Sequence, residues 1–234
     1  MALLIVIGIG LAVTSCGSAP ATSNSAASAT RSASGSHSAS TVAPSPAASV
    51  PPGYSRIGGA EQGISVAAPA SWVEINPTKE TLQAAAKKLG TKGISPSVLV
   101  QDFEALQKQH GIIVFDVKSA IDSPGHFARN LNDYCVSSGV TDVGAAGIPF
   151  VKSAAAAEFG NVGATHVAQR DVEIGGVPGV ETSYQLGSTS GTIYGSQLEV
   201  LPKQDKACFV TLSTGPGESA DDILSVAAAT AQFP

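Results

Sequence analysis

Residues 165–186 have the sequence THVAQRDVEIGGVPGVETSYQL. From Val180 to Leu186 every second residue is Val, Thr, Tyr or Leu, an alternation typical of a strand that buries one face. Residues 165–174 predict a second strand, and the glycine- and proline-rich segment 175–179 predicts the turn between the two. Strands joined by so short a turn pair antiparallel, so this stretch predicts an antiparallel sheet.

The rest of the chain extends this pattern. Further strands are expected at residues 112–118, 131–136, 192–201 and 207–213, and a hairpin is expected from residues 63–67 and 72–75 around a turn at 69–71. Helices are expected at residues 78–89, from a cap at Ser95 or Ser97 to Lys108, at residues 148–159, and after Ser219, with Asp221 and Asp222 in the first turn. Strands interspersed with helices predict the α+β class, a central antiparallel β-sheet flanked by helices.

The N-terminal segment determines the expected compartment. Residues 1–15 are small or apolar and carry no charged side chain, and the apolar run that ends at Val13 is too short to span a bilayer. The sequence Val13-Thr14-Ser15-Cys16 resembles the bacterial lipobox, which implies signal cleavage between Ser15 and Cys16 and attachment of lipid, palmitate included, to Cys16. We therefore expect a lipoprotein signal peptide and a chain anchored on the outer face of the cell membrane. The alternative is an ordinary secretory signal in which the cysteine occurs by chance.

Two zones follow the signal peptide. Residues 16–53 begin with the lipidated cysteine and continue as a Ser-, Ala- and Pro-rich chain, which buries too little apolar surface to fold and predicts a disordered tether. Residues 54–234 have the composition of a globular domain and are enough for a single core. Every Asp and Glu lies in this second zone, the first being Glu61.

Charge and motifs narrow the classes of function. The chain has 13 Lys and Arg against 18 Asp and Glu without a basic cluster, which argues against nucleic-acid binding. The histidines of the globular zone, His110, His126 and His166, are scattered, and no metal-ligand spacing is present, so no metal site is expected. Gly187-Ser188-Thr189-Ser190-Gly191 has threonine where a nucleophile elbow has serine, and it predicts a loop. We therefore expect no catalytic residue, no cofactor and no enzymatic activity.

Cys135 and Cys208 remain once Cys16 is assigned to lipid. An even number of cysteines in an exported domain permits a disulfide, and both cysteines lie in apolar strand segments. The alternative is two separate buried thiols that act as small hydrophobic residues. The sequence leaves both open, because it does not say whether the two strands are neighbours.

The segment Gly63-Ile64-Ser65-Val66-Ala67-Ala68-Pro69-Ala70-Ser71-Trp72 combines a strand, a proline turn and a tryptophan, and it resembles the start of PsbP-like domains. Asn130-Leu131-Asn132, the turn at 175–179 with Tyr184 beyond it, and the closing helix up to Phe233 are similar too. Over residues 54–234 the chain resembles actinobacterial lipoproteins of the Lpq type, which carry this domain behind a lipobox. The resemblance implies an α-β-α sandwich and a binding or adaptor role without established enzymatic activity.

Two classes of function follow. The first is a membrane-anchored extracytoplasmic binding or adaptor module at the cell envelope, attached to the membrane through Cys16 and bound to an envelope protein or glycan. The second is a carrier of a small molecule or lipid, or an enzyme, whose site has no linear motif. A closed pocket with convergent polar groups would favour the second class, and a shallow groove lined by the sheet would favour the first.

Overall fold

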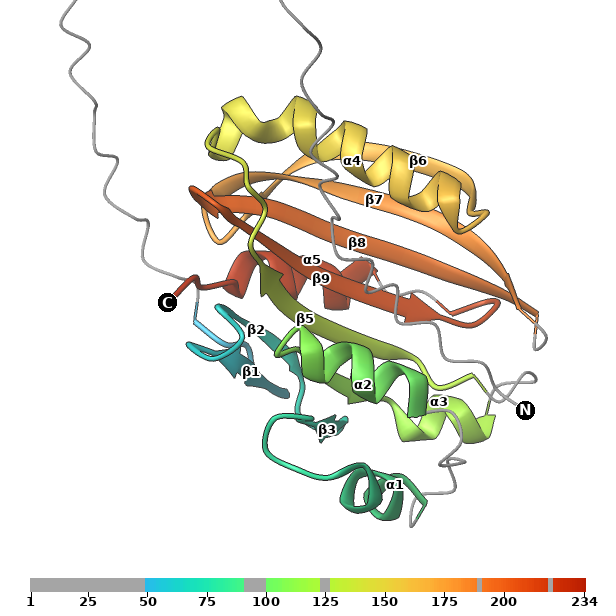
Figure 1. Ribbon diagram of the computed structural model, residues 1–234. Coiled ribbons are helices and arrows are strands. Elements are labelled where there is room, and N and C mark those ends of the chain that lie inside the picture. The colour runs from blue at the N-terminus through green and yellow to red at the C-terminus, as the bar shows by residue number, and fades with distance from the viewer. Residues whose placement is uncertain (1–48, 91–99, 123–126, 189–190, 219–220) are drawn as a thin grey trace, which may run out of the picture.

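The computed structural model describes residues 49–90, 100–122, 127–188, 191–218 and 221–234. Within them, seven strands form one antiparallel sheet in the order β3-β4-β5-β9-β8-β7-β6 (Figure 1). The strands are β3 (Val73–Ile75), β4 (Ile112–Phe115), β5 (Asn130–Val136), β6 (Thr165–Ile174), β7 (Val177–Ser188), β8 (Gly191–Lys203) and β9 (Lys206–Thr214). A separate two-stranded sheet pairs β1 (Tyr54–Gly59) with β2 (Ile64–Pro69).

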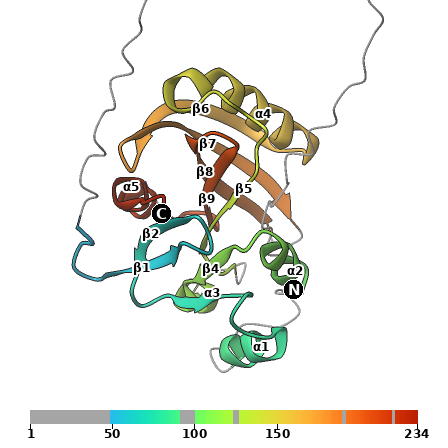
Figure 2. The same cartoon turned by 60° about the vertical axis from the view of Figure 1, so that its left-hand side comes forward.

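Helices and the small sheet cover the two faces of the large sheet. The helices are α1 (Leu82–Gly90), α2 (Val100–Lys108), α3 (Val117–Asp122), α4 (Ile148–Asn161) and α5 (Asp221–Thr230). Figure 2 shows α5 and the β1–β2 pair on one side of the sheet, here called the α5 face, and α4 on the other, the α4 face. The prediction of an α+β fold with a central antiparallel sheet flanked by helices is therefore confirmed.

The core follows from strand alternation. On the α5 face, Leu224 of α5 and Val66 of β2 pack in one buried cluster with alternate residues of the central strands, such as Val210. On the α4 face, Phe159 of α4 stacks on Tyr184 of β7 with ring centroids 4.2 Å apart. A third cluster buries α1, α2 and α3 against β3 and β4. Each face thus buries its own set of apolar side chains.

Most predicted elements lie where the sequence placed them. The strand predicted at residues 165–174 coincides with β6, and the other predictions after residue 130 fall within β5, α4, β7, β8 and β9. The five-residue turn at 175–179 is wrong in extent, because Gly175 and Gly176 alone form it, with φ of 58° and 78°. Two successive residues with positive φ make the tight turn that hairpins favour, so β7 begins at Val177.

The hairpin predicted from residues 63–67 and 72–75 is wrong. The first of these segments lies in β2, which pairs with β1, whereas Val73–Ile75 form β3 and pair with β4 in the large sheet. The chain turns away after Pro69, whose carbonyl accepts the backbone N–H of Trp72 at 3.0 Å. The Trp72 side chain packs partly buried against the α5-face core, and the guanidinium of Arg129 lies 5.4 Å from its ring centroid. Trp72 therefore contributes to the packing of the core on the α5 face.

Two further boundaries differ because side chains cap the backbone locally. The strand predicted at residues 112–118 ends at Phe115, since Asp116 Oδ1 accepts the backbone N–H groups of Lys118 and Ser119 and starts α3. The helix predicted from Thr78 begins at Leu82 instead. Asn76 Oδ1 accepts the backbone N–H of Thr78 in a turn, and Thr81 Oγ1 accepts the N–H of Ala84 at 3.2 Å. The predicted caps Ser95, Ser97 and Ser219 lie outside the described residues.

Candidate functional site

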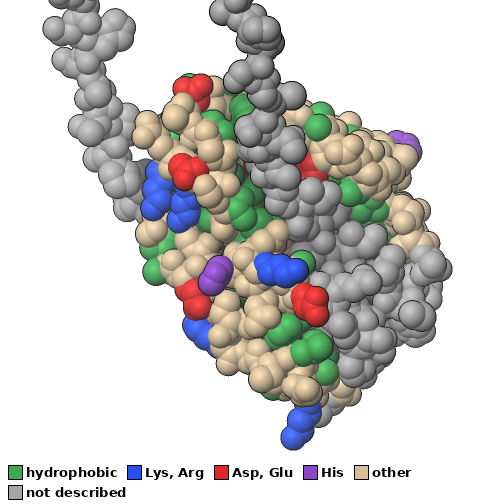
Figure 3. Space-filling view, viewed as in Figure 1, with side chains coloured by type: hydrophobic (Ala, Val, Ile, Leu, Met, Phe, Trp, Pro, Cys, Tyr) green, Lys and Arg blue, Asp and Glu red, His purple; other side chains and the backbone are tan. Residues whose placement is uncertain are grey.

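The predicted anchor lies outside the part of the chain that the structure describes. This applies to Ser15, Cys16 and the tether up to residue 48, whereas the first described strand begins at Tyr54. Among the described residues, no helix is both long enough and apolar enough to cross a membrane. On the face drawn in Figure 3, acidic and basic side chains of the described residues are interspersed without an extended basic patch.

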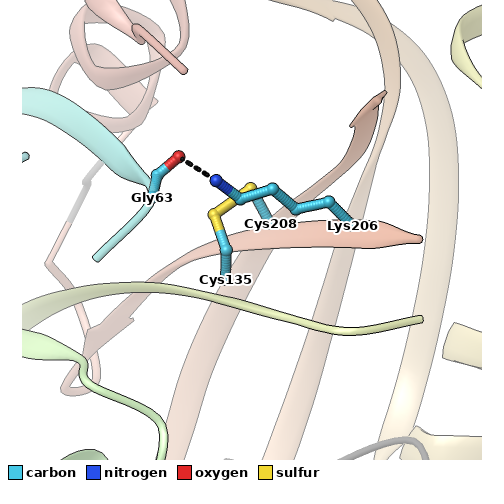
Figure 4. Close-up of a disulfide and its surroundings, with 4 residues drawn as sticks. All are labelled: Gly63, Cys135, Lys206 and Cys208. Carbon is cyan, nitrogen blue, oxygen red and sulfur yellow. Dashed lines mark hydrogen bonds between the residues drawn. A yellow bond between two sulfur atoms is a disulfide. The ribbon is translucent and has the colours of Figure 1, made fainter. Parts of the chain in front are cut away.

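Cys135 and Cys208 are joined by a disulfide. They are directly paired residues of the neighbouring strands β5 and β9, and their Cα atoms lie 4.1 Å apart. Beside the bond, Lys206 Nζ donates to the carbonyl oxygen of Gly63 at 3.0 Å (Figure 4), and burial lowers the pKa of this amine. The disulfide links β5 to β9 within the large sheet. The hydrogen bond of Lys206 connects the turn after β1 to the same sheet. The disulfide and the lysine therefore have a structural role.

The two described histidines lie on different parts of the fold. His110 follows α2 and His166 lies in β6, both with positive φ, and His126 lies outside the described residues. No group of three or more His, Cys, Asp or Glu within the described segments could hold a metal ion. Of the segment predicted as a loop at 187–191, the described residues Gly187, Ser188 and Gly191 belong to the hairpin that joins β7 to β8.

An open groove lies on the α5 face, where β7, β8 and β9 extend past the first turn of α5. Its volume is about 540 Å³. The sheet forms its floor, and Gly217, Glu218 and Asp221 form one wall. The lining residues are His166, Ser183, Tyr184, Gln185, Tyr194, Gly195, Ser196, Leu212, Thr214, Gly217, Glu218, Asp221 and Leu224.

Strand register places the polar side chains of this groove next to one another. Gln185 pairs with Tyr194 and Ser183 pairs with Ser196 across β7 and β8, so all four side chains point toward the α5 face. Tyr194 is 40% exposed although it lies in the interior of a strand. Within the described part of the chain, the side chains of Gln185, Tyr194 and Ser196 form no hydrogen bond, so these groups are available to a ligand.

The acidic wall of the groove has two different carboxylates. Glu218 Oε2 accepts the backbone N–H of Gly215 at 3.1 Å, which orders the loop after β9. Asp221 is exposed in the first turn of α5, where the helix dipole favours a negative charge. Among the described hydroxyl groups, His166 Nδ1 is hydrogen-bonded only to that of Thr165, at 3.3 Å. No described serine or threonine of the groove is therefore paired with a base in the way nucleophilic catalysis requires.

A second polar feature is buried on the α4 face. Thr182, Gln197, Thr211 and Asn132 are in register across β7, β8, β9 and β5, and each is at most 1% exposed. Thr211 Oγ1 donates to Gln197 Oε1 at 3.0 Å. The Thr182 hydroxyl and both amide atoms of Asn132 have no partner among the described residues. We call these four residues the polar row.

Two carboxyl groups lie beside the polar row. Glu199 of β8 is 2% exposed, and burial raises its pKa to about 8, with the charge of Glu158 on α4 adding to the rise. Burial also raises the pKa of Glu158 to about 7. Tyr134 and Tyr184 are buried as well, and this burial raises the pKa of each phenol. The negative charge of Glu158 adds to both increases. At neutral pH the Glu199 carboxyl is therefore mostly protonated.

Neither the groove nor the polar row was predicted from the sequence. Thr182 was predicted on the buried face of its strand, but Gln197 and Glu199 occupy buried positions of β8 that an amphipathic pattern would fill with apolar residues. Their polarity at alternate positions was the available signal. The groove gives no such signal in the sequence, because its residues come from five separate elements, β6, β7, β8, β9 and α5.

The fold and site thus define an antiparallel α+β domain with an open, polar groove. No family model and no curated protein matches the sequence. Among solved structures, the chain is similar to cyanobacterial PsbP from Synechocystis sp. PCC 6803, at 12% identity and a TM-score of 0.42, over 78% of this chain and 93% of that one.

The chain is also similar to parts of other solved structures, including two bacterial proteins. A protein from Bacteroides thetaiotaomicron VPI-5482 has 11% identity and a TM-score of 0.41, over 73% of this chain and 45% of that one. A protein of unknown function from Pseudomonas aeruginosa has 15% identity and a TM-score of 0.30, over 41% of this chain and 63% of that one. This chain thus spans less than two thirds of the length of each of these two proteins.

Proposed function

We propose that this chain is a membrane-anchored extracytoplasmic binding or adaptor module, held by lipid on Cys16, whose binding surface is the groove on the α5 face. We further propose that it is a PsbP-like lipoprotein of the Lpq type, on the sequence resemblance given above. The observation that carries the binding role is the groove of about 540 Å³, open to solvent, in which Gln185, Tyr194 and Ser196 are free to bind.

The construction of the groove supports recognition. Its floor consists of paired strands, so the positions of Gln185 and Tyr194 are set by backbone hydrogen bonds between β7 and β8. A site built on rigid elements loses little conformational entropy when it binds. The groove is open to solvent and lined by the sheet, which fits the binding class better than a closed pocket would.

One observation favours carriage of a small molecule as a second candidate function. The polar row leaves the buried Thr182 hydroxyl and the buried Asn132 amide without partners among the described residues. Buried polar groups of this kind are normally satisfied by protein, by water or by a ligand. A small polar molecule held on the α4 face would satisfy them.

Photo-cross-linking in intact cells tests the binding role of the groove. A benzophenone amino acid replaces Asp221, which is exposed at the groove wall, in the full-length chain. The control carries the same group at Phe150, which is 38% exposed on α4. We expect light-dependent adducts at position 221 and not at position 150. Equal adduct patterns at both positions, or none at either, would contradict the proposal.

A further inference from the structure

We infer that the groove binds a neutral, hydroxyl-rich ligand of the oligosaccharide class, an inference that rests on the proposed function. The reasons are the size of the groove, the mixture of groups on its floor and the sign of its charge. The lining residues determine all three properties.

The size of the groove fits a short chain of sugar units. Its volume of about 540 Å³ lies within the range of small-molecule sites, roughly 300–1,000 Å³. A stable protein partner instead needs a surface of about 800 Å² on each side. The volume of the groove thus accommodates a ligand of a few sugar units.

The groove floor presents an aromatic ring beside a planar amide. Tyr194 is 40% exposed, and its direct cross-strand neighbour is Gln185. The tyrosine ring offers an apolar face and a hydroxyl at its tip. A sugar ring has the matching character, with an apolar C–H face and hydroxyl groups at its edge. The Tyr194 ring can therefore stack on the sugar while its neighbours bind the hydroxyl groups.

The polar groups of the floor match hydroxyl groups, each of which both donates and accepts. The Gln185 amide supplies two N–H donors and one carbonyl acceptor, and the hydroxyls of Ser196 and Tyr194 supply both roles. Ser183 is less available, because its hydroxyl already reaches the carbonyl of Ala168 at 3.5 Å. Three neighbouring side chains can therefore donate to or accept from a polyol without leaving a buried charge.

The charge of the groove disfavours anionic ligands. None of the residues that line the described groove is Lys or Arg, and Glu218 and Asp221 make one wall acidic. A phosphate, sulfate or carboxylate on the ligand would meet like charge there. The Asp221 carboxylate can instead accept hydrogen bonds from sugar hydroxyls. A basic peptide would suit this acidic wall but would leave the neutral polar floor unused.

Saturation-transfer NMR on the full-length chain in detergent tests the inference. The probes are short neutral gluco-, manno-, galacto- and xylo-oligosaccharides, with a sulfated oligosaccharide and an oligolysine peptide for comparison. We expect saturable binding of at least one neutral oligosaccharide and of neither charged probe. Tyr194→Ala and Gln185→Ala should each weaken that binding about tenfold or more.

Phe150→Ala is the matched control, since Phe150 is about as exposed as Tyr194 but lies on α4. It should leave sugar binding unchanged, and circular dichroism checks that all three variants are folded. The absence of binding by any neutral probe, binding of oligolysine in its place, or full affinity in Tyr194→Ala would overturn the inference. If cross-linking at Asp221 captures a partner while no sugar binds, only the oligosaccharide inference fails; if both experiments are negative, the proposed function fails as well.

Discussion

Tyr184 occupies the space in which any side chain at residue 195 would lie. The two residues are paired across β7 and β8, and a Cβ atom at Gly195 would be 2.1 Å from Tyr184 Cζ. The tyrosine ring is held there by stacking on Phe159 of α4, at 4.2 Å between centroids. The glycine therefore allows an aromatic ring of β7 to cover β8 and join α4 to the sheet.

Gly195→Ala should destabilise the domain by about 1–3 kcal/mol, the cost typical of overpacking a core. Gly187→Ala in the same strand pair is the matched control, because nothing lies within 4 Å of a Cβ atom at that glycine. Urea unfolding of both variants measures the difference in the free energy of unfolding. Equal stability of the two would show that the Tyr184 ring moves aside without cost.

The disulfide should contribute substantially to stability. Cys135 and Cys208 are 73 residues apart in sequence, and closing a loop of this length stabilises by on the order of 4 kcal/mol in the chain-entropy model. The double variant Cys135→Ala/Cys208→Ala should therefore unfold at lower urea concentration than the oxidised protein. Adding a thiol reductant should lower the midpoint of the wild type and leave that of the variant unchanged. Alkylation of both cysteines in the exported protein without prior reduction would rule the bond out.

Removal of the hydroxyl should change the stability of the domain differently at the two threonines of the polar row. Thr182 and Thr211 are equally buried, but only Thr211 has a partner among the described residues, Gln197 Oε1 at 3.0 Å. Thr211→Val should cost about 1 kcal/mol, whereas Thr182→Val should be neutral or stabilising because it removes an unpaired buried hydroxyl. Thermal unfolding compares the two. A loss of stability in Thr182→Val as large as in Thr211→Val would indicate that Thr182 is also hydrogen-bonded, for instance to water or to a bound molecule.

The stability of the domain should fall as the pH rises from about 4.5 to about 8. The ordinary pKa of a glutamate side chain is 4.5, and burial raises the pKa of Glu199 to about 8 in the folded protein. Between these values the folded state binds a proton that the unfolded chain has released, so raising the pH favours unfolding. Burial raises the pKa of Asp133 and Glu158 as well, and both act with the same sign.

Glu199→Gln replaces the protonated carboxyl by a neutral group of similar shape. It should make the dependence on pH shallower and raise the urea midpoint above that of the wild type near the upper end of this window. Asp221→Asn is the control, since Asp221 is exposed and should leave the dependence unchanged. A wild-type midpoint that rises from pH 4.5 to pH 8 would contradict the assignment of raised pKa values.

Cys16→Ala tests the proposed anchor. The variant should no longer incorporate labelled fatty acid, and it should be released from the membrane or accumulate as uncleaved precursor, because the thiol that accepts the lipid is absent. Ser18→Ala, two residues further along the chain, should be lipidated normally. Membrane retention of Cys16→Ala at the wild-type level without fatty-acid label would show that another segment attaches the chain.

Much of the fold could be predicted because its signals are local. The alternation from Val180 to Leu186 and the adjoining glycines predict strands and a turn, since neighbouring residues of a strand point to opposite faces. The predictions for residues 112–118 and 78–89 failed at their ends, where the side chains of Asp116 and Asn76 bind nearby backbone groups. Local capping overrode the hydrophobic pattern there.

The sequence by itself determined the segments that form strands apart from β1, that the class is α+β, and that two cysteines were left to pair. Only the tertiary structure decided that β2 pairs with β1, that Cys135 faces Cys208, and that Gln185 lies beside Tyr194 in a groove. The physical reason is that alternation depends on adjacent residues, whereas register depends on contacts between residues far apart in the chain. A shift of one residue in one pairing would turn every side chain of a strand to the other face, so the site exists only in the folded register.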